Sequence, residues 1–114
     1  MAHTHPHTPD QSDAPDLADV DVLTVLQALS DPVRLEIVRQ LAACCEVEGP
    51  GELTCGEIDL PVSKSTTTHH LKTLASAGIT ADRGEGTRKY VHLRRTELEE
   101  RFPGLIESVL RAAS

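Results

Sequence analysis

Residues 63–93 restrict the possible folds more than any other segment, because they combine a capped helix, a helix stop and a hairpin. Ser63 is a typical N-cap residue, and Gly78 is a typical glycine after the last helical turn. One side of the helix is predicted to face inward and consists of Thr67, Leu71 and Leu74. The opposite side is polar and consists of Lys64, Ser65, Thr68, His69 and Lys72. We therefore predict a surface helix between Ser63 and Gly78.

A hairpin is predicted directly after this helix. Residues 79–81 and 89–93 have the composition of two short strands, and Gly84-Glu85-Gly86 lies between them as the turn. The basic residues around these glycines are Arg83, Arg88 and Lys89. The hairpin is therefore expected to have a basic tip.

Two helices are predicted in the first half of the chain. Apolar residues recur at steps of three through Leu17, Val20, Leu23 and Leu26, with Leu29 following. This spacing favours an amphipathic helix over residues 17–29. Asp31 and Pro32 mark the start of a second helix that ends near Cys45, because Asp is a good cap and Pro suits the first helical position.

Shorter helices complete the predicted elements. Thr54 and Glu57 have the spacing of a capping box for a helix over about residues 54–60. A last apolar stripe consists of Leu98, Phe102, Leu105, Ile106, Val109 and Leu110. Pro103 interrupts this stripe, and we interpret it as the first residue of the last helix. These patterns predict a mainly α-helical fold with a small β-hairpin.

The chain divides into a tail and one domain. Residues 1–16 contain His3, His5 and His7, three Pro, three Asp and hardly any apolar side chain. Such a segment cannot bury enough surface to offset its ordering entropy, so we expect it to be disordered. Residues 17–114 are long enough for one domain with a modest core.

Charge is distributed unevenly along the chain. The net charge is −7, yet residues 63–95 carry seven Lys or Arg against two acids, a net charge of +5. The remaining residues carry four Arg against sixteen acids, a net charge of −12. A basic face on an acidic body can attract a polyanion, because the local field acts within about 10 Å at ordinary salt. A solvated basic surface without a partner is the alternative interpretation.

A short helix, a four-residue break, a capped helix and a basic hairpin follow the plan of a winged helix-turn-helix. In such folds the second helix lies in the DNA major groove. The candidate DNA-binding residues are Ser63, Lys64, Ser65, Thr66, Thr68, His69 and Lys72 on the helix, and Arg83, Arg88 and Lys89 on the wing. Short hydroxyl side chains can approach bases, whereas cations hold phosphates. Alternatively, Ser-Thr-Thr-Thr is only a weak helix start that caps itself.

From about Val22 to Leu110 the sequence resembles the ArsR/SmtB family of winged-helix transcriptional regulators. The resemblance is carried by A-L-S-D-P-V-R-L-E-I-V-R-Q-L at residues 28–41, V-S-K-S-T-T-T-H-H-L-K-T-L-A-S-A-G-I at residues 62–79 and R-G-E-G-T-R-K-Y-V-H-L at residues 83–93. It implies a homodimer formed by the first and last helices. It also implies a palindromic DNA operator, because a two-fold protein matches two half-sites.

The resemblance also implies an effector, commonly a metal ion or an oxidant. Two metal-site patterns of the family are absent here: residues 52–58 hold one Cys instead of a Cys-x-Cys pair, and residues 97–114 hold no His. Three thiols remain as candidate soft-metal ligands, at Cys44, Cys45 and Cys55. A buried Cys44 or Cys45 that only continues the apolar stripe is the alternative.

The tail is a second candidate metal site. His3, His5 and His7 offer imidazole ligands suited to nickel or zinc, whereas a polar tail without any ligand is the alternative. His69, His70 and His92 are weaker candidates for the same role. We expect His70 to pack beneath the predicted recognition helix and His69 to face DNA.

Several function classes are disfavoured by the sequence. We find no nucleophile elbow, glycine-rich phosphate loop or His-Glu-x-x-His pattern, which argues against an enzyme. The longest apolar run is too short to span a membrane, and no export signal is recognised, so we expect a cytoplasmic protein with reduced thiols. The remaining possibilities are a DNA-binding regulator, responsive to a metal, to thiol chemistry or to neither, and a dimeric interaction module that does not bind DNA.

Overall fold

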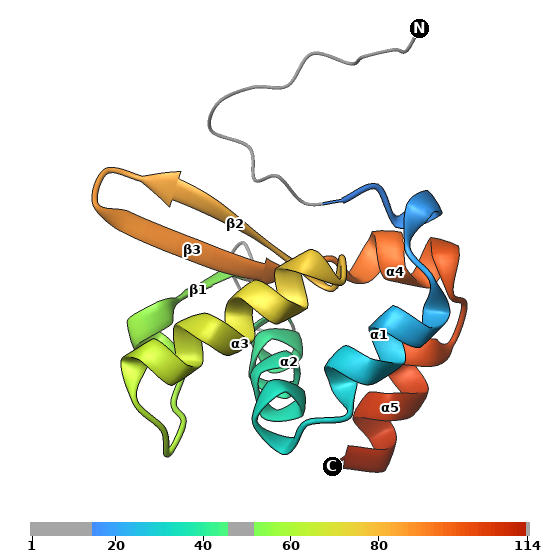
Figure 1. Ribbon diagram of the computed structural model, residues 1–114, viewed down its shortest axis with the longest axis horizontal. Coiled ribbons are helices and arrows are strands. Elements are labelled where there is room, and N and C mark those ends of the chain that lie inside the picture. Colours follow the sequence, from blue (N-terminus) through green and yellow to red (C-terminus); the bar gives the residue numbers. More distant parts are fainter. Residues whose placement is uncertain (1–14, 46–51, 114) are drawn as a thin grey trace, which may run out of the picture.

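The computed structural model describes residues 15–45 and 52–113. Its elements are a 3₁₀ turn η1 (Leu17–Asp19), α1 (Val22–Leu29), α2 (Pro32–Cys45), β1 (Glu52–Thr54), a 3₁₀ turn η2 (Cys55–Glu57), α3 (Lys64–Ser76), β2 (Thr80–Glu85), β3 (Arg88–Leu93), α4 (Arg95–Arg101) and α5 (Leu105–Ala113). The fold is mainly α-helical with a small antiparallel sheet, as predicted (Figure 1). Within the described ranges, no helix is long and apolar enough to cross a lipid bilayer.

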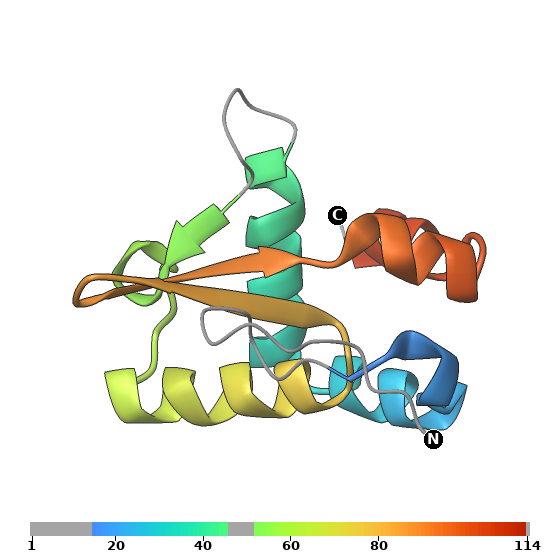
Figure 2. The same ribbon diagram turned by 90° about the horizontal axis from the view of Figure 1, so that it is seen from above.

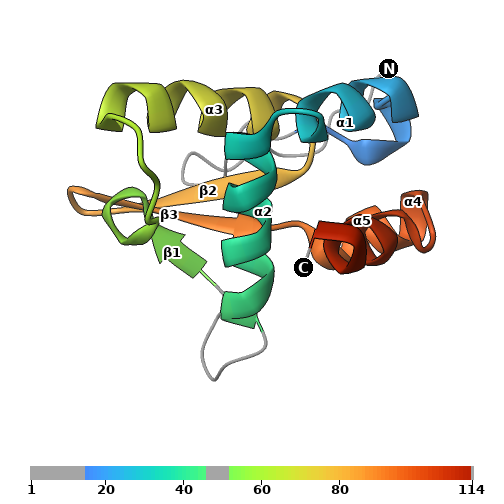
Figure 3. The same cartoon turned by 90° about the horizontal axis from the view of Figure 1, so that it is seen from below.

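The helices and the sheet form two layers around one core. Figures 2 and 3 show α1 and α3 end to end along one side of the molecule, with the sheet, α4 and α5 behind them. Helix α2 runs back from this side past the sheet. The largest fully buried side chains come from the first four α-helices, from the start of the sheet and from the residue before it, and are Val25, Ile37, Val38, Leu41, Leu74, Ile79, Thr80 and Leu98. The outward side of α3 is therefore left free of core packing.

Both ends of α3 form as the sequence predicts. The hydroxyl of Ser63 accepts a hydrogen bond from the Thr66 N–H at 3.2 Å, which caps the start of the helix. At the end, Gly78 adopts φ +81°, and the Ile79 N–H donates to the Leu74 carbonyl at 3.0 Å. This closes the last turn and buries Ile79 beside Leu74.

The start of α2 is also confirmed. The Asp31 carboxylate accepts hydrogen bonds from the N–H groups of Val33, at 2.9 Å, and Arg34, at 3.0 Å. Pro32 is the first helical residue. Since Pro has no N–H to satisfy there, it costs the helix nothing.

The first predicted helix begins later than expected, and two leucines of its apolar stripe face solvent. Residues 17–19 form η1, the α-helix begins only at Val22, and Leu23 and Leu26 are 60% and 42% exposed. Each step of three residues falls about 60° short of a full helical turn, so the stripe that begins at Leu17 drifts to the opposite face by Leu26. The buried residues of α1 are instead Val25, Ala28 and Leu29.

The predicted helix over residues 54–60 is reduced to the single turn η2. Its capping box is present, because the Thr54 N–H donates to the Glu57 carboxylate at 2.8 Å. The helix does not continue, because the Gln40 side chain binds both backbone groups of Asp59, at 3.0 and 2.7 Å. Strand β1, which pairs with β3 and precedes this turn, was not predicted.

Two turn positions also differ from prediction. The pairing of Glu85 with Arg88 places the hairpin turn at Gly86-Thr87, so the strands are longer than expected. Of the two glycines in the predicted turn, only Gly86 adopts a positive φ, of +63°, which this hairpin turn requires. Pro103 does not begin the last helix, because Gly104 follows it with φ +81° and α5 starts at Leu105.

The tail prediction falls mostly outside the described residues, which begin at Pro15. Asp16 accepts a hydrogen bond from the Ala18 N–H at 3.0 Å and caps η1. The Pro15 carbonyl accepts one from Arg94 at 2.8 Å. The last two residues assigned to the tail thus contact the domain.

Replacing Gly78 with alanine is expected to destabilise the protein. Its φ is strained for any other residue, and an added Cβ would lie 2.6 Å from Leu17 Cδ2. We expect Gly78→Ala to lower the free energy of unfolding by about 2 kcal/mol in urea titrations.

Gly84→Ala is the matched control, because nothing lies within 4 Å of its added Cβ and its φ is ordinary. It should change stability by less than about 0.5 kcal/mol. Equal effects of the two substitutions would contradict this description of the end of α3.

Candidate nucleic-acid interface

The outward side of α3 presents a band of polar side chains. Its exposed residues are Lys64, Ser65, Thr68, His69 and Lys72, the same five that the sequence placed there. Thr67 is only 5% exposed and Leu74 is fully buried, so the inward side also matches. Leu71 is half-buried. The helix is thus anchored by one face and leaves the other available to a partner.

The hydroxyl groups at the start of α3 are used in part by one another. Ser63 Oγ lies 3.2 Å from Ser65 Oγ and donates to Thr66 Oγ1 at 3.0 Å. These contacts fit the alternative interpretation, in which the segment caps itself. The Thr68 hydroxyl differs, because it has no hydrogen bond to any other residue that the structure describes. Thr68 and His69 therefore offer the polar groups of this face that the helix does not itself require.

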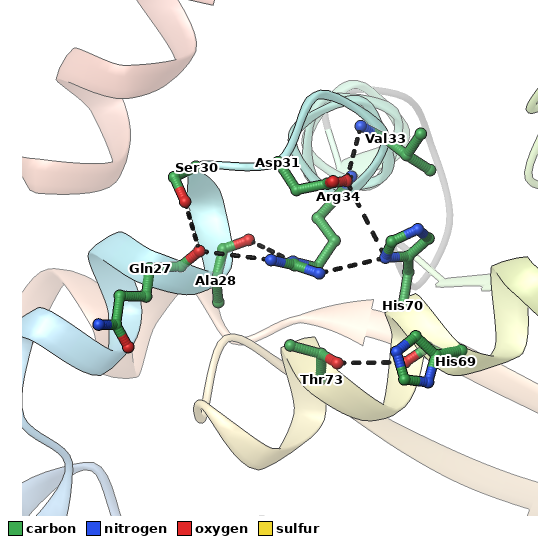
Figure 4. A network of polar contacts seen from close by, with 9 residues as sticks. All are labelled: Gln27, Ala28, Ser30, Asp31, Val33, Arg34, His69, His70 and Thr73. Atoms are coloured by element: carbon green, nitrogen blue, oxygen red, sulfur yellow. Dashed lines mark hydrogen bonds and ion pairs between the residues drawn. The ribbon is translucent and has the colours of Figure 1, made fainter.

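Arg34 of α2 joins α1 and α3 (Figure 4). Its guanidinium donates to the carbonyl oxygens of Ala28, at 2.7 Å, and Gln27, at 3.4 Å, which belong to the last turn of α1. A third nitrogen lies 3.2 Å from His70 Nδ1 on the inner side of α3. As predicted, His70 faces the protein and His69 faces outward.

Asp31 completes this junction. Its carboxylate lies 3.9 Å from His70 Nδ1 while it caps α2. The N–H of Arg34 donates to the carboxylate, and this hydrogen bond lowers the pKa of Asp31 from its ordinary value. The junction fixes the angle between α2 and α3, the helix that carries the polar band.

Arg83 lies in the middle of the wing, opposite Tyr90, and is held there by other side chains. Its guanidinium binds the Glu52 carboxylate at 2.8 and 3.2 Å and the Glu85 carboxylate at 2.8 Å, and it lies 4.7 Å from the centre of the Tyr90 ring. It thereby ties β1 to β2 and β3. Two carboxylates neutralise this cation, which leaves less attraction for a phosphate than the sequence alone suggested.

The other two wing cations are more open. Arg88 is exposed at the start of β3 and makes no ion pair with the part of the chain that the structure describes. Lys89 is 69% exposed, and its Nζ lies 3.4 Å from an Asp82 carboxylate oxygen. Arg88 is thus the wing cation best placed to meet an anion.

The wing and α3 share one small cleft. It has a volume of about 110 Å³ and is lined by Thr68 and Lys72 of α3 and by Lys89 of β3, among others. Figure 1 shows the hairpin tip and the start of α3 extending from the same end of the molecule. One extended ligand could therefore touch both.

The proposed metal ligands lie outside the part of the chain whose side chains the structure describes. His3, His5 and His7 lie outside the described residues, as do the side chains of Cys44, Cys45 and Cys55. In residues 15–45 and 52–113, no group of three His, Cys, Asp or Glu side chains is arranged to hold a metal ion. The rings of His69 and His70 meet edge to face, with centres 5.8 Å apart.

Sequence reasoning missed the roles of Arg34 and Glu52. Glu85 could have been found as a partner of Arg83, because residues two apart on a strand share a face. Glu52 could not, because β1 was not predicted. Nothing in the spacing of Asp31 and Arg34 indicates that the latter reaches back to α1.

The Glu52–Arg83 pair makes stability depend on pH. The hydrogen bonds from Arg83 lower the pKa of Glu52 below its ordinary value of 4.5. A carboxyl with a lowered folded-state pKa stabilises the protein above pH 4.5, and this contribution is lost as pH falls through the folded-state pKa. Glu52→Gln should therefore lower the thermal unfolding midpoint at pH 7 and have a progressively smaller effect below pH 4. A pH-independent difference between the two proteins would contradict the pair's role.

Comparisons with known proteins agree with this geometry. A helix-turn-helix domain model matches residues 29–83. The chain is 40% identical over 87 residues to the uncharacterized HTH-type transcriptional regulator YceK of Bacillus subtilis, covering 75% of this chain and 82% of that protein. It is 42% identical over 74 residues to the HTH-type transcriptional regulator Rv2034 of Mycobacterium tuberculosis, covering 63% of each. The chain belongs to the helix-turn-helix family of transcriptional regulators.

Proposed function

We propose that the protein is a sequence-specific regulator of the ArsR/SmtB type that binds a palindromic operator in double-stranded DNA as a cytoplasmic homodimer. The observation that carries the proposal is the polar, lysine-edged side of α3, which is exposed along its length while the opposite side is buried. The chain belongs to a family of helix-turn-helix transcriptional regulators, which also argues against an enzyme.

Each candidate residue receives a role from its position. Ser65, Thr68 and His69 face outward near the start of α3, where they can read base edges in the major groove. Lys64 and Lys72 lie on either side of them and bind phosphates. Ser63 and Thr66 stabilise the start of the helix and hold its N–H groups toward a phosphate.

On the wing, Arg88 and Lys89 contact the backbone of the adjoining groove. Arg83 orients the wing through Glu52 and adds a weaker attraction for phosphate. The basic residues are concentrated between positions 63 and 95, so the acidic remainder of the chain keeps other surfaces from binding DNA.

The homodimer is supported by apolar surface on the first and last helices. Val22, Leu23 and Leu26 are exposed on α1, and Val109 and Leu110 are only half-buried on α5. A second copy would remove these side chains from water. Two copies related by a two-fold axis present two α3 helices, which explains a palindromic site.

DNA binding can be tested without knowing the operator. The full chain should select one symmetric motif from randomised duplexes, and its affinity should fall steeply with salt. Lys64→Ala and Arg88→Ala should weaken binding to every duplex, and each should reduce the salt slope by about 0.9. Thr68→Ala and His69→Ala should instead lower the preference for the selected motif by about tenfold.

Arg39→Ala is the control, because it removes the same charge from an exposed position on α2 that is paired with Glu36 at 2.8 Å. It should leave affinity and salt slope nearly unchanged. If the Thr68 and His69 variants keep full sequence preference, the recognition face is misassigned. Salt-independent binding, or no selected motif, would favour a dimeric interaction module that does not bind DNA.

We further propose that a divalent transition ion, nickel or zinc, is the effector. The proposal rests on His3, His5 and His7 and on Cys44, Cys45 and Cys55, whose residue types suit such ions. A metal-independent or thiol-responsive regulator is the alternative.

Calorimetry with nickel and zinc separates these possibilities. The full chain should bind one of the ions with modest affinity. Loss of the heat on deletion of residues 1–16 would assign the site to the tail, and loss in the triple Cys→Ser variant would assign it to the thiols. No heat from the full chain would contradict the metal proposal.

A further inference from the structure

A groove runs between α1 and α3 beside the polar band. It has a volume of about 540 Å³ and is open to solvent. Its lining consists of Thr24, Gln27, Ala28, Arg34, His69, Lys72, Thr73, Ser76 and Ala77. Thr24, Gln27 and Ser76 were not among the candidate DNA-binding residues, and they extend the polar surface beyond the start of α3.

The chemistry of this groove suits an anion. Arg34 and Lys72 contribute positive charges and His69 a polar ring, whereas no Asp or Glu is among the lining residues. The guanidinium of Arg34 is fixed by two carbonyl oxygens and His70 Nδ1, none of which carries a formal negative charge (Figure 4). The nearby Asp31 carboxylate, whose pKa the charge of Arg34 helps to lower, offsets part of this charge. The remainder, together with the charge of Lys72, attracts an external anion. Thr24, Gln27 and Ser76 supply hydrogen-bond donors beside it.

The position of the groove indicates which anion it meets. Helix α3 has 13 residues, so it is about 20 Å long, whereas the major groove is about 12 Å wide. When the start of α3 faces base edges, its second half reaches the bordering phosphates. Figures 2 and 3 show α1 continuing the same side of the molecule beyond the end of α3.

We propose that this groove receives the phosphate backbone of the bound duplex. Lys72 and Arg34 attract the strand, and Thr24, Gln27 and Ser76 donate hydrogen bonds to its phosphate oxygens. The inference rests on the proposed function and adds α1 to the DNA-contacting surface. An open groove suits a continuous strand, whereas a small anion is normally held in a more enclosed site.

Thr24→Glu tests the groove with little risk to folding, because Thr24 is exposed in the first turn of α1, where a carboxylate interacts favourably with the helix dipole. It should lower affinity about fivefold for the selected motif and for unrelated duplexes, with a smaller effect at high salt. Thr96→Glu, also exposed and in the first turn of α4, is the matched control and should change affinity less than twofold.

Phosphate-ethylation interference locates the contact directly. Ethylation of phosphates bordering the half-site should impair binding of the full chain. Gln27→Ala should remove that interference there while leaving the phosphates contacted by Lys64 and Arg88 sensitive. Thermal unfolding of each variant verifies that it is folded.

The outcomes separate this inference from the proposed function. Equal effects of Thr24→Glu and Thr96→Glu, in a chain that still binds its motif, would overturn the groove contact alone. The groove contact would also be overturned if inorganic phosphate saturated the groove in a titration while ethylation of the bordering DNA phosphates did not impair binding. That pair of results would identify a small-anion site instead. Failure of the full chain to bind duplexes would overturn the proposed function itself.

Discussion

The Arg34 guanidinium joins three helices through hydrogen bonds to α1 carbonyls and to His70 on α3. Its own helix is capped by Asp31, which also lies 3.9 Å from His70. A planar, multidentate donor can satisfy several acceptors in one fixed geometry, which a lysine cannot. The junction therefore orients α3 relative to α1 and α2, while the buried side of α3 supplies apolar contact. The position of the outward polar band depends on both.

Local sequence signals predicted the parts of the fold that local interactions determine. The caps at Asp31 and Ser63 and the stop at Gly78 each involve residues within a few positions of one another, and each is present. The polar and apolar sides of α3 follow from helix periodicity alone. They placed the polar candidates of α3 on one exposed side, whereas the short helix predicted before α3 is present only as the turn η2.

Features set by distant residues were not predictable in this way. Helix 54–60 stops because the Gln40 side chain binds the backbone of Asp59, 19 residues away in the sequence. The candidate site shows the same limit. The sequence indicates that Arg83 is a free wing cation. In the structure, β1 brings the carboxylate of Glu52 beside it, although the two residues are 31 positions apart in the sequence. Counting charges identifies a basic region. Only the ion pairs in the structure show that Arg83 is bound by carboxylates, whereas Arg88 makes no ion pair with the described residues.

The central claim is that the outward side of α3 enters duplex DNA together with the wing tip. Amide chemical-shift mapping of the isotope-labelled full chain, titrated with its selected duplex, tests this most directly. The account predicts the largest shifts at residues 63–72 and at Arg88 and Lys89, with little change in α4. Shifts confined to α4 and the buried side of α2, with none along residues 63–72, would contradict it.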